Sequence, residues 1–161
     1  MGGRIVTVIP HVGKRRDHLR ISFAPSGTTR EFSEVASALM NENDAEHEPI
    51  TAMLEKPEKV SSFGESDVDF WLGKIVAWAK SEDIAGGLAK YRALPTDSVG
   101  ARPMRHIAAL ALAGNVEKIE EYFCSFKAGN RLGFVPYITE SMLDRAIELA
   151  RREGDNARWK R

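Results

Sequence analysis

Apolar side chains recur at helical intervals along most of this chain, and no other feature of the sequence constrains the fold as strongly. From Phe32 onward they return every three or four residues, a spacing that places them on one face of a helix. The first such face carries Phe32, Val35, Ala36, Leu39 and Met40. Similar faces follow as far as Ala150, so the sequence predicts a mainly helical protein.

The first 30 residues carry a different pattern, which predicts strands. Arg4–Ile9 is rich in β-branched residues, and Leu19–Phe23 alternates apolar with polar residues, as half-buried strands do. The basic stretch Lys14–Asp17 lies between them. We therefore expect an antiparallel hairpin with a basic loop, and a third strand around Lys59–Phe63 stays open as an alternative to a polar linker.

Capping residues and prolines predict where the helices begin and end. Thr28 and Glu31 have the spacing of a capping box, which places a helix start at Thr28. Pro49 suits the first turn of a short second helix. Ser66 has capping spacing for the next helix, and Gly154 fits the position just after the end of the last one.

These elements predict an α+β fold that is mainly helical. An N-terminal antiparallel β-hairpin or small sheet is followed by antiparallel helix hairpins. The 161 residues fit one domain, because a chain of this length buries roughly two-thirds of the surface that its unfolded form exposes. Within a single domain of residues 1–161, we expect an α/β part over residues 1–60 and a helical part over residues 65–154.

The single cysteine, Cys124, excludes a disulfide within the chain and favours a reducing compartment. Its aromatic neighbours Phe123 and Phe126 predict a thiol packed in the core. No apolar run approaches the roughly 18 residues that span a bilayer, and Ile5–Ile9 is too short for the core of a signal peptide. We expect a soluble cytoplasmic protein that does not bind membranes.

Charge is divided along the chain although the formal net charge is zero. Residues 1–30 carry six Lys and Arg against one acid, residues 31–70 carry two against eleven, and residues 71–161 carry fifteen against eleven. This pattern indicates either mutual neutralisation on the folded surface or an acidic face that steers a basic partner. Nucleic acid is not the expected partner, because the pI is near 6.9 and nucleic-acid-binding proteins usually show a broad basic surface.

Known motifs for metal ions, cofactors and nucleophilic catalysis are missing from the sequence. His11, His18, His47 and His106 lack the spacing of metal ligands, and no GxSxG, Walker or GxGxxG motif occurs. Glu65, Asp67 and Asp69 form an acidic cluster. Acids are favoured at a helix N-terminus by the unpaired amides there, and the same cluster is a candidate for binding a partner. We expect no cofactor and no metal site.

The segment Lys127–Tyr137 joins two expected helices yet is unusually apolar for a loop. It carries Arg131, Leu132, Phe134, Val135 and Tyr137. Loop residues of this kind are either buried or offered to a partner. Burial under the last helix is one interpretation. An aromatic anchor beside Arg131 is the other, because Tyr and Arg are frequent in the energetic centres of interfaces.

We interpret the chain as a non-enzymatic protein-binding module. One concrete version is a small bacterial toxin-neutralising protein of the immunity type, which acts by stoichiometric blockade and needs no catalytic residue. The expected partner-binding residues are Arg131, Phe134, Tyr137, Glu65, Asp67 and Asp69. The alternative is a small enzyme, which predicts a cleft that brings together His106, Arg102, Arg131 and Tyr137.

Overall fold

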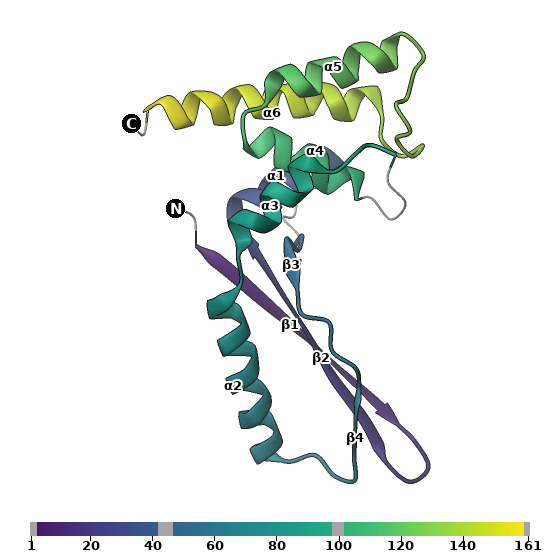
Figure 1. The fold of residues 1–161 in the computed structure, drawn as a ribbon, viewed down its shortest axis with the longest axis vertical. Helices are drawn as coiled ribbons and strands as arrows, with labels where there is room; N and C mark the ends of the chain where they lie inside the picture. The colour runs from purple at the N-terminus through teal and green to yellow at the C-terminus, as the bar shows by residue number, and fades with distance from the viewer. Residues whose placement is uncertain (1–2, 42–46, 98–101, 160–161) are drawn as a thin grey trace. The chain divides into compact units, whose positions relative to one another are not determined.

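The computed structural model describes residues 3–41, 47–97 and 102–159, with side chains described as far as residue 156. The fold is α+β and mainly helical, with an antiparallel sheet formed near the N-terminus (Figure 1), which confirms the predicted fold class. The strands are β1 (Arg4–Lys14), β2 (Leu19–Thr29), β3 (Thr51–Ala52) and β4 (Glu58–Val60). The helices are α1 (Arg30–Met40), α2 (Glu65–Ser81), α3 (Ile84–Ala93), α4 (Pro103–Leu112), α5 (Val116–Lys127) and α6 (Glu140–Trp159).

The chain divides into two compact units whose segments alternate along the sequence. Unit 1 comprises Met1–Thr29 and Pro49–Ile84, and unit 2 comprises Arg30–Glu48 and Ala85–Arg161. The sheet and α2 therefore belong to unit 1, whereas α1 belongs to unit 2 with the later helices. The prediction of a single domain stays a prediction.

The sheet of unit 1 is centred on β2. Strands β1 and β2 pair antiparallel along their whole length, from Arg4 opposite Thr29 to Lys14 opposite Leu19. The short strands β3 and β4 both pair antiparallel with β2 on its other side, at opposite ends of the strand. Since β4 spans Glu58–Val60, a strand does form at the start of the segment where the sequence left one open.

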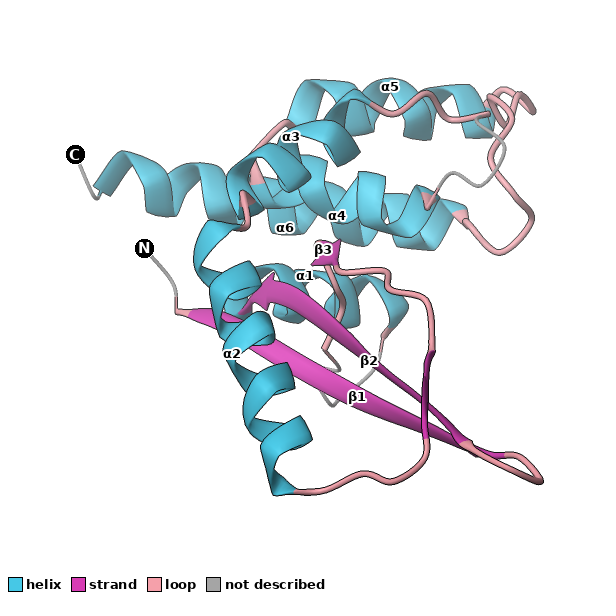
Figure 2. Cartoon of the chain, turned by 60° about the horizontal axis from the view of Figure 1, so that its bottom comes forward, coloured by secondary structure: helices cyan, strands magenta, loops and turns pink. Residues whose placement is uncertain are grey.

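Helix α2 packs against β2 and lies at the end of the hairpin away from its turn (Figure 2). The ring of Trp71 lies 4.9 Å from that of Phe23 on β2, and Ile75 is buried beside it. On one flank, Lys74 forms an ion pair of 2.6 Å with Glu55, which lies between β3 and β4. Near the C-terminal end of α2, the guanidinium of Arg4 on β1 donates to the carbonyl oxygens of Ala79 and Glu82.

Unit 2 is a helical body in which α4 contacts α1, α5 and α6. Helices α5 and α6 run antiparallel beside each other (Figure 1). Most members of the apolar faces that the sequence predicted are buried between these helices, whereas Met40 at the end of α1 is 41% exposed. The fully buried members of these faces include Phe32, Leu39, Ile107, Ile119, Leu143 and Ala146.

The two expected helix starts have different outcomes. Thr28 lies in β2 opposite Ile5, and α1 begins two residues later, at Arg30. The short helix predicted after Pro49 is wrong. The amides of Ile50 and Met53 instead donate to carbonyl oxygens of β2, at 2.9 and 3.0 Å, and this pairing produces β3.

Three further predictions are corrected. Gly64, rather than Ser66, is the N-cap of α2, and the Asp67 carboxylate accepts the Gly64 amide at 2.9 Å. Gly154 lies inside α6, which continues to Trp159. Cys124 is exposed on α5, because the buried face of that helix is formed by Ile119, Tyr122 and Phe126.

The corner between α4 and α5 generates a prediction about two glycines that face each other. Gly114 has φ +68°, and a Cβ on it would lie 3.1 Å from the Gly154 backbone, whereas a Cβ on Gly154 would meet nothing within 4 Å. Gly114→Ala should therefore lower the free energy of unfolding by about 1 to 3 kcal/mol. Gly154→Ala should raise it by roughly 0.5 to 1 kcal/mol, because alanine is favoured in a helix. Chemical denaturation of both variants measures the difference, and equal effects would contradict this account of the corner.

Candidate functional site

The segment between α5 and α6 is a fixed loop rather than a loose one. The Arg131 guanidinium donates to the carbonyl oxygens of Val135 at 2.9 Å and Ile138 at 2.6 Å, and it lies 4.7 Å from the centre of the Phe126 ring. Charged donors form stronger hydrogen bonds than neutral ones. Arg131 thus holds the loop against α5 by contacts within the chain.

The apolar residues of this loop are divided between the core and the surface. Phe134 is 4% exposed, and its ring packs edge-on against those of Tyr122 and Phe126. Val135 and Tyr137 are 40% and 53% exposed. Phe134 is thus buried, as the first interpretation expects, and Tyr137 is the aromatic side chain that the loop leaves accessible, while its role as an anchor for a partner stays a prediction.

Tyr137 lines a shallow pocket of about 250 Å³ in unit 2. The other lining residues are Glu48, Arg102, Met104 and Arg105. Arg102 precedes α4 and is exposed, whereas Met104 and Arg105 lie in the first turn of α4 and are half-buried. The pocket thus combines an aromatic ring, a thioether and cationic side chains, which are enriched in protein interfaces.

Two side-chain contacts hold Arg105 in place at this pocket. Its guanidinium forms an ion pair with Glu48 and donates to the Tyr91 hydroxyl at 3.1 Å. The Arg105 side chain is only 12% exposed, so the pair is largely shielded from water. Partial burial raises the pKa of Tyr137, and the negative charge of Glu48 raises it further, so the Tyr137 phenol stays protonated at neutral pH.

His106 does not open into this pocket. The residue is 3% exposed, and its Nδ1 lies 2.7 Å from the Tyr91 carbonyl oxygen. Because a carbonyl only accepts, Nδ1 carries the proton, and Nε2 accepts from the Tyr122 hydroxyl at 3.1 Å. Burial lowers the pKa of His106, and the positive charge of Lys118 adds to this, while the bond to Tyr91 opposes it.

The cleft that the enzyme hypothesis predicts is therefore only partly present. Arg102 and Tyr137 line one pocket, whereas His106 is enclosed between α3, α4 and α5 and Arg131 is bonded to its own loop. Glu48 and Arg105 were missed as members of the pocket. No local signal in the sequence pairs them, because they are 57 residues apart.

The acidic cluster lies in unit 1, at the first turn of α2. Asp67 caps the helix through the Gly64 amide, while Glu65 and Asp69 are exposed. This arrangement fits the attraction of carboxylates to the free amides at a helix N-terminus. Within the described ranges, no group of three or more His, Cys, Asp or Glu side chains could hold a metal ion.

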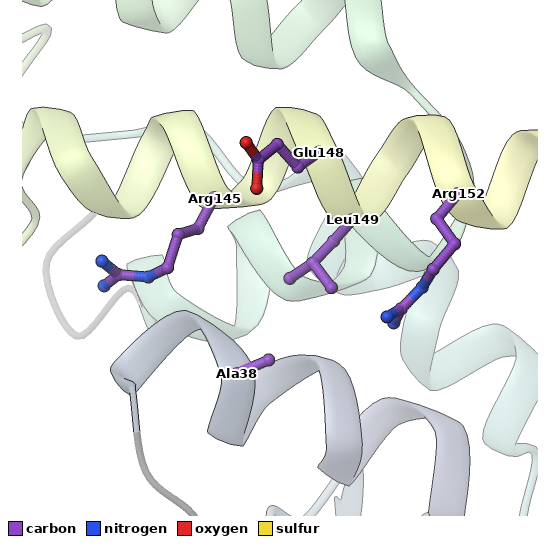
Figure 3. A pocket seen from close by; sticks show the side chains of 5 residues that line it. All are labelled: Ala38, Arg145, Glu148, Leu149 and Arg152. Atoms are coloured by element: carbon purple, nitrogen blue, oxygen red, sulfur yellow. The ribbon is translucent and has the colours of Figure 1, made fainter.

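A second hollow in unit 2, of about 280 Å³, lies between α1 and α6. Its lining residues are Ala38, Arg145, Glu148, Leu149 and Arg152. Figure 3 shows Leu149 directed from α6 toward α1, with Arg145 and Arg152 on either side. Arg145 donates to the Leu39 carbonyl at 2.6 Å, near the end of α1, where a cation is favoured by the free carbonyls. Arg145 thus joins two helices.

Comparison with known proteins places the chain in a family. The model of DUF6990, a family of unknown function, matches residues 1–151. The chain belongs to DUF6990. No curated protein and no solved structure matches it. Membership in DUF6990 does not assign an activity to the chain. In the part of this DUF6990 chain that the structure describes, no helix has both the length and the apolarity needed to cross a membrane.

The Arg131 contacts predict that this side chain stabilises unit 2. Arg131→Met should lower the free energy of unfolding by about 1 to 3 kcal/mol, because the buried Ile138 carbonyl loses a charged donor. Arg151→Met is the matched control, since Arg151 forms a surface ion pair with Glu120 in which the two side chains are 60% and 45% exposed. Denaturant titration compares the two variants. A loss at Arg131 no larger than that at Arg151 would show that the loop does not depend on the guanidinium.

The buried histidine predicts a pH dependence of stability. The His106 pKa is lowered in the folded state, so below the unfolded value of about 6.5 the unfolded chain binds more protons. Above that pH, the contribution of His106 to the free energy of unfolding is fully present. It is lost as the pH falls through 6.5 toward the lower pKa of the folded state. His106→Gln should flatten the slope of unfolding free energy between about pH 7 and 5. An unchanged slope in His106→Gln would overturn the assignment.

Proposed function

We propose that this chain is a non-enzymatic protein-binding module whose binding surface in unit 2 is centred on Tyr137. The observation that carries the proposal is the 53% exposure of this aromatic side chain on a loop fixed by Arg131. A large aromatic side chain that is already held in place loses little conformational freedom when a partner binds. Energetic centres of interfaces are enriched in Tyr and Arg.

The chemistry around Tyr137 indicates what the partner presents. The ring of Tyr137 and the thioether of Met104 fit an apolar side chain inserted into the pocket. Arg102 is exposed at the rim, where it suits a carboxylate of the partner. Phe134 contributes by packing beneath the loop, and Arg131 by positioning it. The acidic residues Glu65, Asp67 and Asp69 stay candidates for a separate contact made by unit 1.

The concrete form of the proposal is a bacterial, cytoplasmic protein of the immunity type, which neutralises a toxin by occupying its surface. Such a protein needs a rigid body, a complementary patch and no reactive group. The enclosed His106 and the fixed loop agree with that requirement. The rival hypothesis of a small enzyme is supported by Arg102 and Tyr137 sharing one pocket.

Affinity capture followed by calorimetry tests the proposal. The full chain is used as bait in the cells that produce it, together with Tyr137→Ala and the control Leu54→Ala, which shortens a side chain that is 92% exposed in unit 1. We expect one partner at fixed stoichiometry with the wild type and the control. With the purified partner, Tyr137→Ala should weaken binding at least about tenfold, the effect of losing an interface anchor.

Two outcomes would contradict the proposal. Equal affinities of the wild type and Tyr137→Ala would remove Tyr137 from the binding surface. Repeated captures that yield no protein, together with a small molecule retained by the wild type and lost in Tyr137→Ala, would favour the enzyme hypothesis. For the immunity version, the partner must also be toxic to cells, and an equimolar amount of this chain must suppress that toxicity.

A further inference from the structure

The outer edge of β1 is exposed and has the properties of a strand that pairs. Among the described strands, β1 pairs only with β2, so one edge of an 11-residue strand presents unpaired amide and carbonyl groups. Long edge strands are normally protected by charges, prolines or bulges. The segment Ile5–Ile9 has neither a charge nor a proline, and Ile5 and Ile9 are 38% and 53% exposed.

The residues of this segment read the same in both directions. The order Ile5, Val6, Thr7, Val8, Ile9 is a palindrome centred on Thr7. When two copies of a strand pair antiparallel about a two-fold axis at Thr7, residues whose numbers sum to 14 lie opposite each other. Isoleucine then faces isoleucine, valine faces valine and threonine faces threonine. The exposed Ile9 would lie against Ile5 of the other copy, where both lose contact with water.

The charges of β1 agree with the same register. Arg4 would lie opposite Pro10, and His11 opposite Gly3, so no like charges face each other across the paired section. The basic end of the hairpin, Lys14–Arg16, would extend beyond the first residue of the other copy's strand. A strand from an unrelated protein would need a matching sequence, whereas a second copy of β1 supplies it by symmetry.

Helix α2 has an exposed apolar flank on the same side of unit 1. Val68, Leu72 and Val76 are four residues apart and are 40%, 52% and 48% exposed. Lys74, about 160° around the helix from Leu72, bonds to Glu55 on the β3 and β4 side, so this flank is directed toward the β1 side. Because α2 packs on β2, one strand in from the edge, three strand spacings of about 4.8 Å would separate the two α2 helices, which are then roughly 14 Å apart with these apolar flanks between them.

We propose that a second copy of this chain pairs with β1 in antiparallel orientation, with the two-fold axis at Thr7, and forms a sheet continuous across a homodimer. The interface buries the β1 edge and the isoleucines beside it, and the Val68–Val76 flanks of the two α2 helices are directed toward each other next to it. This surface is separate from the one around Tyr137, and the inference does not depend on the proposed function.

Placing a positive or a negative charge at position 7 tests where the two-fold axis lies. Only an axis at Thr7 places this residue opposite the same residue of the other copy. Thr7 lies opposite Ser26, next to Gly27, which faces Trp78 of α2. Thr7 therefore points to the other face of the sheet, away from α2.

The wild type should have twice the chain mass of 17.9 kDa by light scattering. Thr7→Lys and Thr7→Glu should each be monomeric, and an equimolar mixture should form a heterodimer. His11→Lys, on the same face and opposite a glycine, should remain dimeric.

Disulfide cross-linking between copies gives a second measurement, which does not require that the charge variants fold. In a Cys124→Ser background, Thr7→Cys should form a disulfide between copies under mild oxidation, because opposite residues in an antiparallel pair have adjacent Cβ atoms. His11→Cys should not, since position 11 of the two copies would be about 27 Å apart. A monomeric wild type at every concentration would overturn the proposal. So would dimeric charge variants, a mixture that stays monomeric, or equal cross-linking at positions 7 and 11.

Discussion

The burial of α4 on several sides is the constraint on which the rest of unit 2 depends. Ile107, Ala108, Ala109, Leu110 and Ala111 are all at most 2% exposed. Consecutive residues of a helix are about 100° apart, so five in a row cover its whole circumference. Helices α1, α5 and α6 supply that cover. The three alanines allow these helices to approach closely, which explains why this stretch lacks larger side chains.

The same constraint determines the state of His106 and the position of the candidate surface. A polar ring at the start of such a helix is costly unless both nitrogens are bonded, and Tyr91 and Tyr122 provide the two partners. Tyr122 in turn packs against Phe134, which anchors the loop that ends at Tyr137. The loop that carries the exposed phenol is therefore held to the core by the packed rings of Tyr122, Phe126 and Phe134.

The sequence predicted the elements that depend on periodicity and missed those that depend on long-range pairing. Helical spacing located α1, α2 and α4 to α6, because a buried face repeats in any sequence that packs. The segment after Pro49 was misassigned as a helix, since its amides donate to carbonyl oxygens of β2, a pairing that no local pattern reveals. For Gly154, packing along α6 overrides the tendency of glycine to end a helix.

The sequence predicted which segment carries the candidate site, but not which of its side chains are buried and which are exposed. An apolar loop at Lys127–Tyr137 was visible in the sequence, whereas the division between the buried Phe134 and the exposed Tyr137 follows from the contacts with α5. Glu48 and Arg105 meet only in the folded chain. The palindrome around Thr7 is readable from the sequence, but its meaning depends on β1 being an edge strand.

The central claim is that unit 2 is a rigid body that presents Tyr137 on a loop fixed to its core. Hydrogen exchange measured by NMR tests it directly, because the amides of Phe134 and Ile138 donate within the loop at 2.9 and 3.1 Å. The account predicts slow exchange at these two amides, approaching the protection of the α4 amides. Exchange at the rate of an unstructured peptide over residues 131–138, with α4 still protected, would contradict it.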